Sequence, residues 1–450
     1  MGVGTLHMGS DLFSNPDQWG NPIQNTWYED TAGTSFSAPI FEGKEDCDTL
    51  IIGGGLAGLA LKSMLSEYQI SCILLEENTI ASGASGMNGG FCTPGWSVDQ
   101  LQLENWLGVS RASQLYSISL AGFQWMKELC QKIDSSISQI KHGVLKACSS
   151  NKISKLESKV HIFNEKYEES IHFLKKDELL QYLLSPRYDC GLLDLQSFQF
   201  NPLNVMRSLA FSIQSKTGKI FENSKATDVG GYKGGYRART FYGGVINAKR
   251  LVFCTGGYFS NLGVSSLNKK LFSLQTSIGV TQPLGQNLSG IISNNIAIHD
   301  NRRAGNYFRI LPDRRLLWGR DIRAIGMQTR RQIIYNTKEE LKFFFPKQAK
   351  IFDDIEVDYG WSGKLGYSSN LMPYLGFMKP NLFILTGFGG HGMNTAPAAA
   401  SLIRDAILGN RSKMQIFEDF IPTWNGGVLG RYAAEMYIRW LKICDQINMA

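Results

Sequence analysis

The feature that most constrains the fold is a glycine-rich turn between two short apolar segments. Residues 49–52 suit a buried parallel strand, and the pattern G-x-G-x-x-G follows at residues 53–58. Apolar residues then recur every three or four positions over 57–68, which predicts a helix. A second apolar segment at 72–75 completes a βαβ unit, so the sequence predicts a dinucleotide-binding Rossmann unit in a fold of the α/β (α+β) class.

Each glycine of this motif has a separate function in the predicted unit. Gly53 allows the tight turn, Gly55 lets the backbone approach a pyrophosphate, and Gly58 lets the helix pack closely on the strand. The phosphates then lie at the positive end of the helix. Glu76 ends the second strand, where its carboxylate can accept hydrogen bonds from a ribose hydroxyl, whereas Glu77 is predicted to be solvated.

A second glycine-rich loop, residues 83–90, follows only a few residues after the second strand. Its small residues let backbone N–H groups face a ligand closely, and we predict cofactor contacts from Ser85, Asn88, Gly89 and Gly90. A nicotinamide-binding domain does not need this loop, but a domain that wraps the ribityl chain and ring of a flavin does. The sequence therefore predicts FAD in preference to NAD.

Several further elements can be outlined from the sequence pattern. Residues 100–200 are predicted as mixed helix and loop, and residues 218–256 as a β-meander with glycine turns. A hairpin is predicted over 306–318. A buried strand at 382–385 leads into a glycine-rich loop, and a helix is predicted to begin at about Pro397.

The loop before this last helix is a second candidate part of the flavin site. Gly389, Gly390 and Gly392 precede a helix whose N-terminus carries partial positive charge. A helix end directed at N1 and C2=O of a reduced flavin would stabilise negative charge there without a titrating group. His391 has two interpretations, either a loop histidine bonded to backbone or a direct contact near the flavin.

Candidate substrate-binding residues come mainly from the segment 302–331, which holds nine arginines. Most of these are predicted to be solvated. Strand alternation places Tyr307 and Arg309 on one face, where a guanidinium and a hydroxyl could together bind a substrate carboxylate. Trp361 is interpreted either as a core residue or as a wall of the substrate cavity, and no catalytic acid–base pair is evident.

The combined motifs resemble the FAD-dependent amine and amino-acid oxidase family, which includes D-amino-acid oxidase and glycine oxidase, and are most similar to its gamma-glutamylputrescine oxidase branch. That branch carries the segment Gly-Ala-Ser-Gly-Arg-Asn-Gly-Gly, matched at residues 83–90, and an aromatic arm similar to residues 27–28. Thr255 and Gly256 match a further cofactor contact after a strand. The arginine of the branch is Met87 here, and this departure bears on activity or specificity.

The resemblance implies a glutathione-reductase-like fold, with an FAD-binding Rossmann domain and a second substrate domain built on an antiparallel sheet. Residues 1–44 are either a flexible tail or an arm that docks its aromatic side chains on the body. The expected division is an N-terminal arm at 1–44, an FAD domain from 45–98, 196–262 and 374–424, a substrate domain from 99–195 and 263–373, and a C-terminal helix at 425–450.

The resemblance also implies a reaction, the oxidation of a C–N bond in a small-molecule amine or amino acid. Hydride passes to flavin N5, the imine is hydrolysed, and oxygen or an electron carrier reoxidises the flavin. Two alternatives stay open, oxidation of a C–O bond in a hydroxy acid on the same fold and a flavin-binding protein without turnover.

Composition excludes several other classes. The net charge is 46 − 39 = +7, which favours anionic ligands without implying nucleic acid. Eight cysteines are scattered without a C-x-x-C pair, so neither a metal site nor a disulfide framework is predicted. No cysteine lies between Cys254 and Cys444, which favours non-covalent FAD. The sequence has no apolar run of membrane-spanning length and no signal-peptide core, so we expect a cytoplasmic protein without a membrane span.

Overall fold

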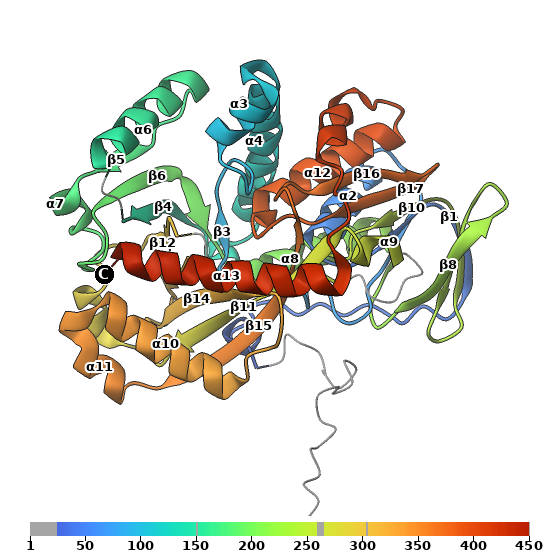
Figure 1. Cartoon of the computed structure of the whole chain (residues 1–450). Helices are drawn as coiled ribbons and strands as arrows, with labels where there is room; N and C mark the ends of the chain where they lie inside the picture. Colours follow the sequence, from blue (N-terminus) through green and yellow to red (C-terminus); the bar gives the residue numbers. More distant parts are fainter. Residues whose placement is uncertain (1–24, 150–151, 259–264, 303–304, 450) are drawn as a thin grey trace, which may run out of the picture.

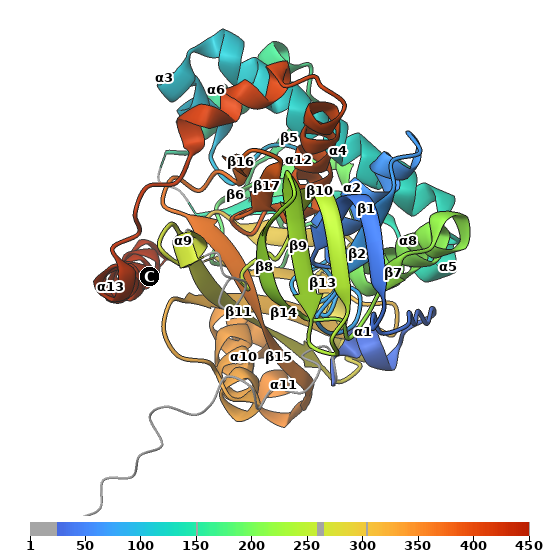
Figure 2. The ribbon, with the colours of Figure 1, turned by 90° about the vertical axis from the view of Figure 1, so that its right-hand side faces the viewer.

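Two large β-sheets form the centre of the molecule, and helices cover their outer faces (Figure 1). The computed structural model describes residues 25–149, 152–258, 265–302 and 305–449. Figure 2 shows the molecule turned by 90°, with the strands of the first sheet in front. No helix in these ranges is both long and apolar enough to cross a membrane.

The first sheet is the predicted Rossmann sheet, with strand order β16-β17-β10-β1-β2-β7 and the antiparallel ribbon β8–β9 added to β10. The strands are β1 (Lys44–Ile52), β2 (Cys72–Leu75), β7 (Ile220–Phe221), β8 (Ala226–Tyr232), β9 (Gly235–Thr240), β10 (Val245–Phe253), β16 (Tyr374–Lys379) and β17 (Leu382–Thr386). β1 lies parallel to both β2 and β10. The predicted βαβ unit and β-meander are both confirmed.

The second sheet has the order β15-β11-β14-β13-β12-β4-β6-β3, with β5 paired to β6. Its strands are β3 (Phe91–Cys92), β4 (Lys141–Cys148), β5 (His172–Leu174), β6 (Cys190–Gln199), β11 (Leu271–Thr281), β12 (Ala297–Asp300), β13 (Tyr307–Ile310), β14 (Leu316–Arg323) and β15 (Val357–Ser368). Most of its pairs are antiparallel, and β13–β14 is the predicted hairpin.

The helices are α1 (Trp27–Asp30), α2 (Leu56–Ser66), α3 (Gln100–Leu107), α4 (Val109–Lys132), α5 (Ser135–Ser138), α6 (Ile153–Tyr167), α7 (Lys176–Leu179), α8 (Pro202–Thr217), α9 (Ser265–Asn268), α10 (Arg330–Phe344), α11 (Ala349–Asp354), α12 (Gly392–Ile407) and α13 (Gly427–Met449). Short 3-10 helices lie at Gly285–Gly290, Pro346–Gln348 and Ser412–Phe420. α12 packs on α2 and α4, and α10 packs on β11 and β15.

Two predictions about these elements were wrong. Residues 100–200 hold strands as well as helices and loops, because β4 and β6 pair along most of their length in the second sheet. The last predicted helix begins at Gly392 rather than at about Pro397, because a proline is also accommodated inside the helix.

The part of the N-terminal arm that the structure describes is docked on the body. Trp27 and Tyr28 in α1 are almost completely buried, with 2% and 0% exposure. The Trp27 indole Nε1 donates to Asp313 Oδ2 at 2.8 Å, at the turn of the β13–β14 hairpin. Docking of the aromatic side chains is therefore observed from residue 25 onward, whereas Trp19 lies outside the described residues.

Candidate active site

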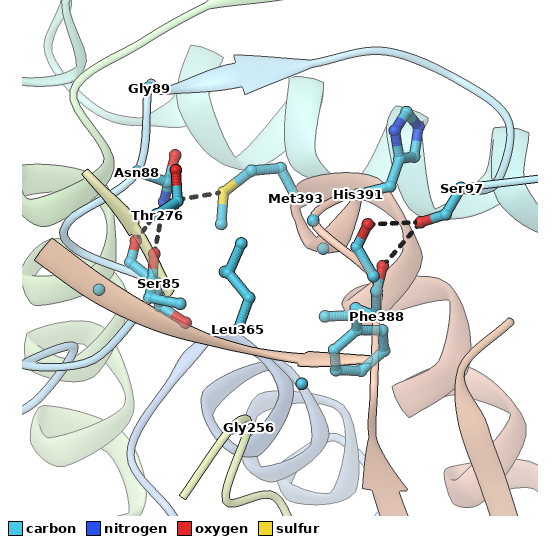
Figure 3. Close-up of a pocket in the computed structure, with 18 of the residues that line it drawn as sticks. Ser85, Asn88, Gly89, Ser97, Gly256, Thr276, Leu365, Phe388, His391 and Met393 are labelled. Atoms are coloured by element: carbon cyan, nitrogen blue, oxygen red, sulfur yellow. Dashed lines mark hydrogen bonds between the residues drawn. The ribbon is translucent and has the colours of Figure 1, made fainter. Parts of the chain in front are cut away.

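A cavity of about 1680 Å³ lies between the two sheets. Gly58 and Gly90 do not line it, but the other predicted cofactor residues do. These lining residues are Gly53, Gly55, Glu76, Ser85, Asn88, Gly89, Thr255, Gly256, Gly389, Gly390 and Gly392. Ser85 and Asn88 lie on one side of the cavity, and Ser97, Phe388 and His391 on the other (Figure 3).

The first glycine motif leaves no room for side chains at two of its positions. Gly53 has a positive φ of 116°, and a Cβ there would lie 2.5 Å from the carbonyl oxygen of Cys254. A Cβ at Gly58 would lie 2.0 Å from the carbonyl oxygen of Gly53. These distances fit the tight turn and the close helix–strand packing that the sequence predicts for the two residues.

The N-terminus of α2 faces the cavity at Gly55, which caps the helix without a side chain. The backbone N–H of Leu56 donates to Ser85 Oγ at 2.9 Å, so the second glycine-rich loop lies directly over this helix end. Free N–H groups and the helix dipole at such an end attract a phosphate. The contact therefore brings the two predicted parts of the cofactor site together.

Glu76 lies beside the first glycine motif and also lines the cavity. Its carboxylate accepts hydrogen bonds from the backbone N–H groups of Gly54 at 2.7 Å and Asn78 at 2.9 Å. Burial nevertheless raises the pKa of Glu76 to about 7, and the two backbone donors only partly oppose this shift. Donation by the hydroxyls of a ribose would favour the ionised form.

The loop at residues 83–90 is held in shape by the side chain of Asn88. Its Nδ2 donates to the carbonyl oxygens of Ala84 at 2.8 Å and Ser85 at 3.0 Å, and its Oδ1 accepts from the N–H of Gly90 at 2.7 Å. Gly90 has a φ of 75°, and a Cβ there would lie 2.1 Å from a backbone oxygen of Phe200. Asn88 and Gly90 thus shape this loop.

Two aromatic residues hold the backbone of the same loop by hydrogen bonds to its carbonyl oxygens. The Tyr28 hydroxyl donates to the carbonyl oxygen of Asn88 at 2.8 Å, and Trp361 Nε1 donates to that of Met87 at 3.0 Å. The two rings meet edge to face with centroids 5.8 Å apart. Met87, which replaces the arginine of the resembled branch, is buried, and both it and Trp361 line the cavity.

The loop before α12 lies on the opposite side of the cavity from Asn88 (Figure 3). Gly389 and Gly390 both have positive φ, and Ser97 Oγ donates to the carbonyl oxygens of Phe388 at 3.0 Å and Gly389 at 2.9 Å. His391 is the N-cap of α12, and its Nε2 lies 3.4 Å from Thr93 Oγ1. Because α12 begins at Gly392, its positive end lies at the cavity, as the flavin hypothesis requires.

Three polar side chains form a row across the second sheet. Lys146 of β4 is the register partner of His299 of β12, and His299 is the partner of Tyr307 of β13. All three line the cavity. The next register partner is Gly319, where a Cβ would lie 2.0 Å from the Tyr307 ring, so this ring lies over the glycine. We refer to Lys146, His299 and Tyr307 as the polar row.

The titratable groups in and around the polar row differ in protonation and in ion pairing. Burial lowers the pKa of His299 to about 3, with Lys146 and His391 adding to the effect, and burial also lowers the pKa of His391. Arg302 nearby is paired with Asp300 at 2.6 Å. Lys146 takes part in none of the ion pairs formed by the described residues. The row therefore presents the amino group of Lys146, which has no acidic partner among the described residues, beside the uncharged imidazole of His299.

The structure does not place Arg309 where we predicted a substrate ligand. Arg309 shares a face with Tyr307, as strand alternation requires, but it is 2% exposed and does not line the cavity. Its Nη2 donates to the Tyr28 hydroxyl at 3.1 Å, and its Nη1 donates to Gln199 Oε1 at 3.4 Å. The guanidinium thus supports the docked arm. Lys146 and His299, which do line the cavity, belong to no motif that is visible in the sequence.

Comparison with known proteins identifies the family. Residues 48–406 match the DAO family, described as FAD dependent oxidoreductase. The chain belongs to this family. It is 26% identical to the probable oxidoreductase OrdL of Haemophilus influenzae, over 94% of this chain and 97% of that protein. Gamma-glutamylputrescine oxidoreductase of Escherichia coli is 25% identical, over 82% and 86% of the two chains.

A solved structure of the same fold contains the cofactor. L-alpha-glycerophosphate oxidase from Mycoplasma pneumoniae, with FAD bound, has a TM-score of 0.64 and 17% identity, and the match covers 81% of this chain and 95% of that chain. The family and fold predictions are confirmed, and the enzyme is an FAD-dependent oxidoreductase. The cavity fits this cofactor, because Thr255 Oγ1 lines it without a hydrogen-bond partner and Gly256 faces open space.

We expect the purified protein to be yellow and to release its flavin on acid precipitation. Cys254 is the one cysteine among the described residues that lines the cavity, and burial raises the pKa of its thiol, so it is poorly suited to a covalent link. The absorbance spectrum of the supernatant and of the pellet checks this expectation. Flavin that stays with the precipitated protein would contradict it.

The affinity for FAD should depend on pH through Glu76. Because its pKa is raised to about 7, the carboxyl is mostly protonated below that pH, and binding of ribose hydroxyls to the ionised form must then release a proton. We expect the Kd to rise by about tenfold from pH 8 to pH 6. Titrating apoprotein with FAD measures this. Glu76→Gln should flatten the dependence, and Glu45→Gln should leave it unchanged, because Glu45 pairs with Lys219 and does not line the cavity.

Proposed function

We propose that this enzyme oxidises the C–N bond of a small amine or amino acid that carries a carboxylate. The observation that supports the proposal is the polar row, where Lys146 has no acidic partner in the described part of the chain and lies in register with His299, itself the partner of Tyr307. An ammonium group can bind a carboxylate, and a phenol hydroxyl beside it can donate a further hydrogen bond.

The remaining groups suit the other end of such a substrate. A neutral amine is the form that can be oxidised, and His299 and His391 are uncharged at neutral pH, so they can accept hydrogen bonds from an amine nitrogen without repelling it. Bound FAD supplies the two-electron acceptor. Leu365 and Phe388 line the cavity near the α12 loop and help to exclude water (Figure 3).

The names of the similar proteins include both an amine and an alcohol substrate. The second relative is named for gamma-glutamylputrescine, which contains an amine and a carboxylate. The solved structure is named for glycerophosphate, which is oxidised at a C–O bond. Oxidation of a hydroxy acid is therefore the second candidate, and oxygen or a separate electron carrier would reoxidise the flavin in either case.

Anaerobic mixing with a substrate panel tests the proposal directly. Amines with and without a carboxylate, amino acids and the matching hydroxy acids are each added in the absence of oxygen, and loss of the flavin absorbance near 450 nm reports reduction. We expect bleaching by carboxylate-bearing amines. Bleaching by hydroxy acids alone would replace the proposal by the second candidate, and a flavin that no compound reduces would favour a binding protein without turnover.

Lys146→Met should weaken catalysis while FAD stays bound. Losing one charge-assisted hydrogen bond in a partly dry cavity costs about 1.5–3 kcal/mol, or roughly a 10- to 150-fold fall in kcat/KM for the carboxylate-bearing amine. The same amine without its carboxylate should lose much less. Lys249→Met is the control, because Lys249 is 76% exposed and pairs with Asp48 far from the cavity. Equal effects of the two substitutions would remove Lys146 from the site.

A further inference from the structure

The long C-terminal helix α13 exposes a continuous apolar stripe. It runs across the outside of the molecule in Figure 1 and is seen nearly end-on at its edge in Figure 2. Six large apolar side chains of the helix recur at spacings of three and four, and each is more than half exposed. They are Leu429, Tyr432, Met436, Trp440, Ile443 and Ile447. Contiguous patches of this kind mark interaction surfaces.

The opposite face of α13 is anchored to the body, so the orientation of the stripe is fixed. Ile438 and Leu441 are buried, with 8% and 9% exposure. Glu435 Oε2 accepts hydrogen bonds from the N–H groups of Ala324 at 2.9 Å and Ile325 at 3.2 Å. Lys442 forms an ion pair with Asp321 of β14. A helix held by these contacts cannot turn its stripe inward, and the stripe stays available to a partner.

The spacing of the stripe specifies a helical partner. Steps of 3, 4, 4, 3 and 4 residues keep all six side chains on one face of the helix, which suits packing against a second helix. The two successive steps of four depart from the strict a and d spacing of a coiled coil. We propose that α13 is the dimer interface of this protein and that its stripe packs against the same stripe of a second copy. In this pair the two helices run antiparallel, about a two-fold axis perpendicular to them that also relates the two bodies.

Charge favours a second copy over a membrane surface. A helix that binds anionic lipid has an excess of free lysine and arginine beside its apolar face. On α13, Arg439 is paired with Glu435 at 2.9 Å, and Lys442 is held by Asp321. Arg431 is the remaining cation of α13; it is exposed and belongs to none of the ion pairs of the described residues. One free arginine is not the basic excess that binding to anionic lipid requires, and it leaves little repulsion between two copies.

The antiparallel arrangement also fits in shape and area. A two-fold axis at Ile438 places Leu429 opposite Ile447 of the second copy and Met436 opposite Trp440, a thioether–aromatic contact. The six side chains of the stripe and their exposed neighbours Trp424, Val428 and Tyr437 each expose roughly 100 Å² of surface, or about 900 Å² per copy. A standard interface buries about 800 Å² of surface on each partner.

Sedimentation equilibrium of the FAD-loaded full chain tests the proposal. We expect the wild type to have twice the mass of one chain and Met436→Glu to be monomeric, because the new carboxylate faces Trp440 of the second copy. Flavin content shows that the variant is folded. Phe211→Glu on α8 is the matched control, since Phe211 is equally exposed at 65%, and this variant should remain dimeric.

Mixing two variants tests the antiparallel pairing. Met436→Glu and Trp440→Lys should each be monomeric alone and should form a mixed dimer together, because the two new charges face each other only in the antiparallel arrangement. A monomeric wild type, a dimeric Met436→Glu, or monomers that sediment with anionic vesicles of phosphatidylglycerol would overturn the proposal. If the two variants do not form a mixed dimer, the antiparallel arrangement is wrong. None of these results depends on the substrate of the enzyme.

Discussion

Gly55→Val is expected to abolish FAD binding. Gly55 caps α2 at the cavity, and a Cβ there would already lie 2.9 Å from Ser85 Oγ, so the two further methyl groups of valine would fill the space where a pyrophosphate meets the helix end. We expect affinity to fall by about 100-fold or more, equivalent to about 2.8 kcal/mol. The flavin-to-protein ratio after dialysis and a titration of apoprotein with FAD measure the loss.

The backbone at Gly55 makes this substitution informative. Its φ is −81°, which any residue adopts, whereas Gly53 has a φ of 116° and could fail through backbone strain alone. Gly231→Val, on the β8–β9 ribbon where a Cβ meets nothing within 4 Å, is the control and should keep its flavin. If Gly55→Val retains stoichiometric flavin, the phosphate site does not lie at this helix end.

Tyr28→Phe should lower the free energy of unfolding by about 2–3 kcal/mol, although it removes one oxygen atom. The hydroxyl of Tyr28 accepts a hydrogen bond from Arg309 and donates one to the carbonyl oxygen of Asn88. The side chains of Tyr28 and Arg309 are both buried. Without this hydroxyl, a buried guanidinium and a backbone carbonyl of the flavin loop each lose a partner. Denaturant unfolding gives the change in stability, and we also expect weaker binding of FAD to the apoprotein.

A second substitution separates this effect from a role in substrate binding. In Tyr28→Phe with Arg309→Met, the unpaired charge is gone, so part of the lost stability should return, as a double-mutant cycle would record. Tyr335→Phe is the control, since Tyr335 is 64% exposed on α10. If Arg309→Met instead leaves stability and FAD affinity unchanged but raises KM for a carboxylate-bearing substrate, the supporting role is wrong.

The cofactor-binding residues could be predicted because the residues that form this part of the site lie close together in the sequence. Gly53, Gly58 and Glu76 lie within one βαβ unit, and the chemistry of each follows from its distance along the chain to the turn. The helix end at Gly392 could not be located in the same way. Proline is common in a first helical turn, and the start of the helix was therefore placed near Pro397, although the structure carries this proline inside α12.

The substrate side could not be predicted because it depends on strand register. Alternation correctly puts Tyr307 and Arg309 on one face, but it does not say which of the two reaches the cavity. That choice follows from the pairing of β13 with β12 and of β12 with β4, which brings Lys146 beside His299. A single lysine within the apolar stretch at 144–147 was the one available signal in the sequence.

The strand order of the first sheet has a consequence for synthesis of the protein on the ribosome. β1 is made early, yet one of its two neighbours is β10, and Asp48 and Lys249, which bridge these strands, are 201 positions apart. α12, which covers α2 and α4, ends only at Ile407. Chains with such distant pairings fold slowly and expose apolar surface meanwhile. A nascent chain should therefore need chaperone protection until nearly its full length has emerged, and FAD can be captured only after that.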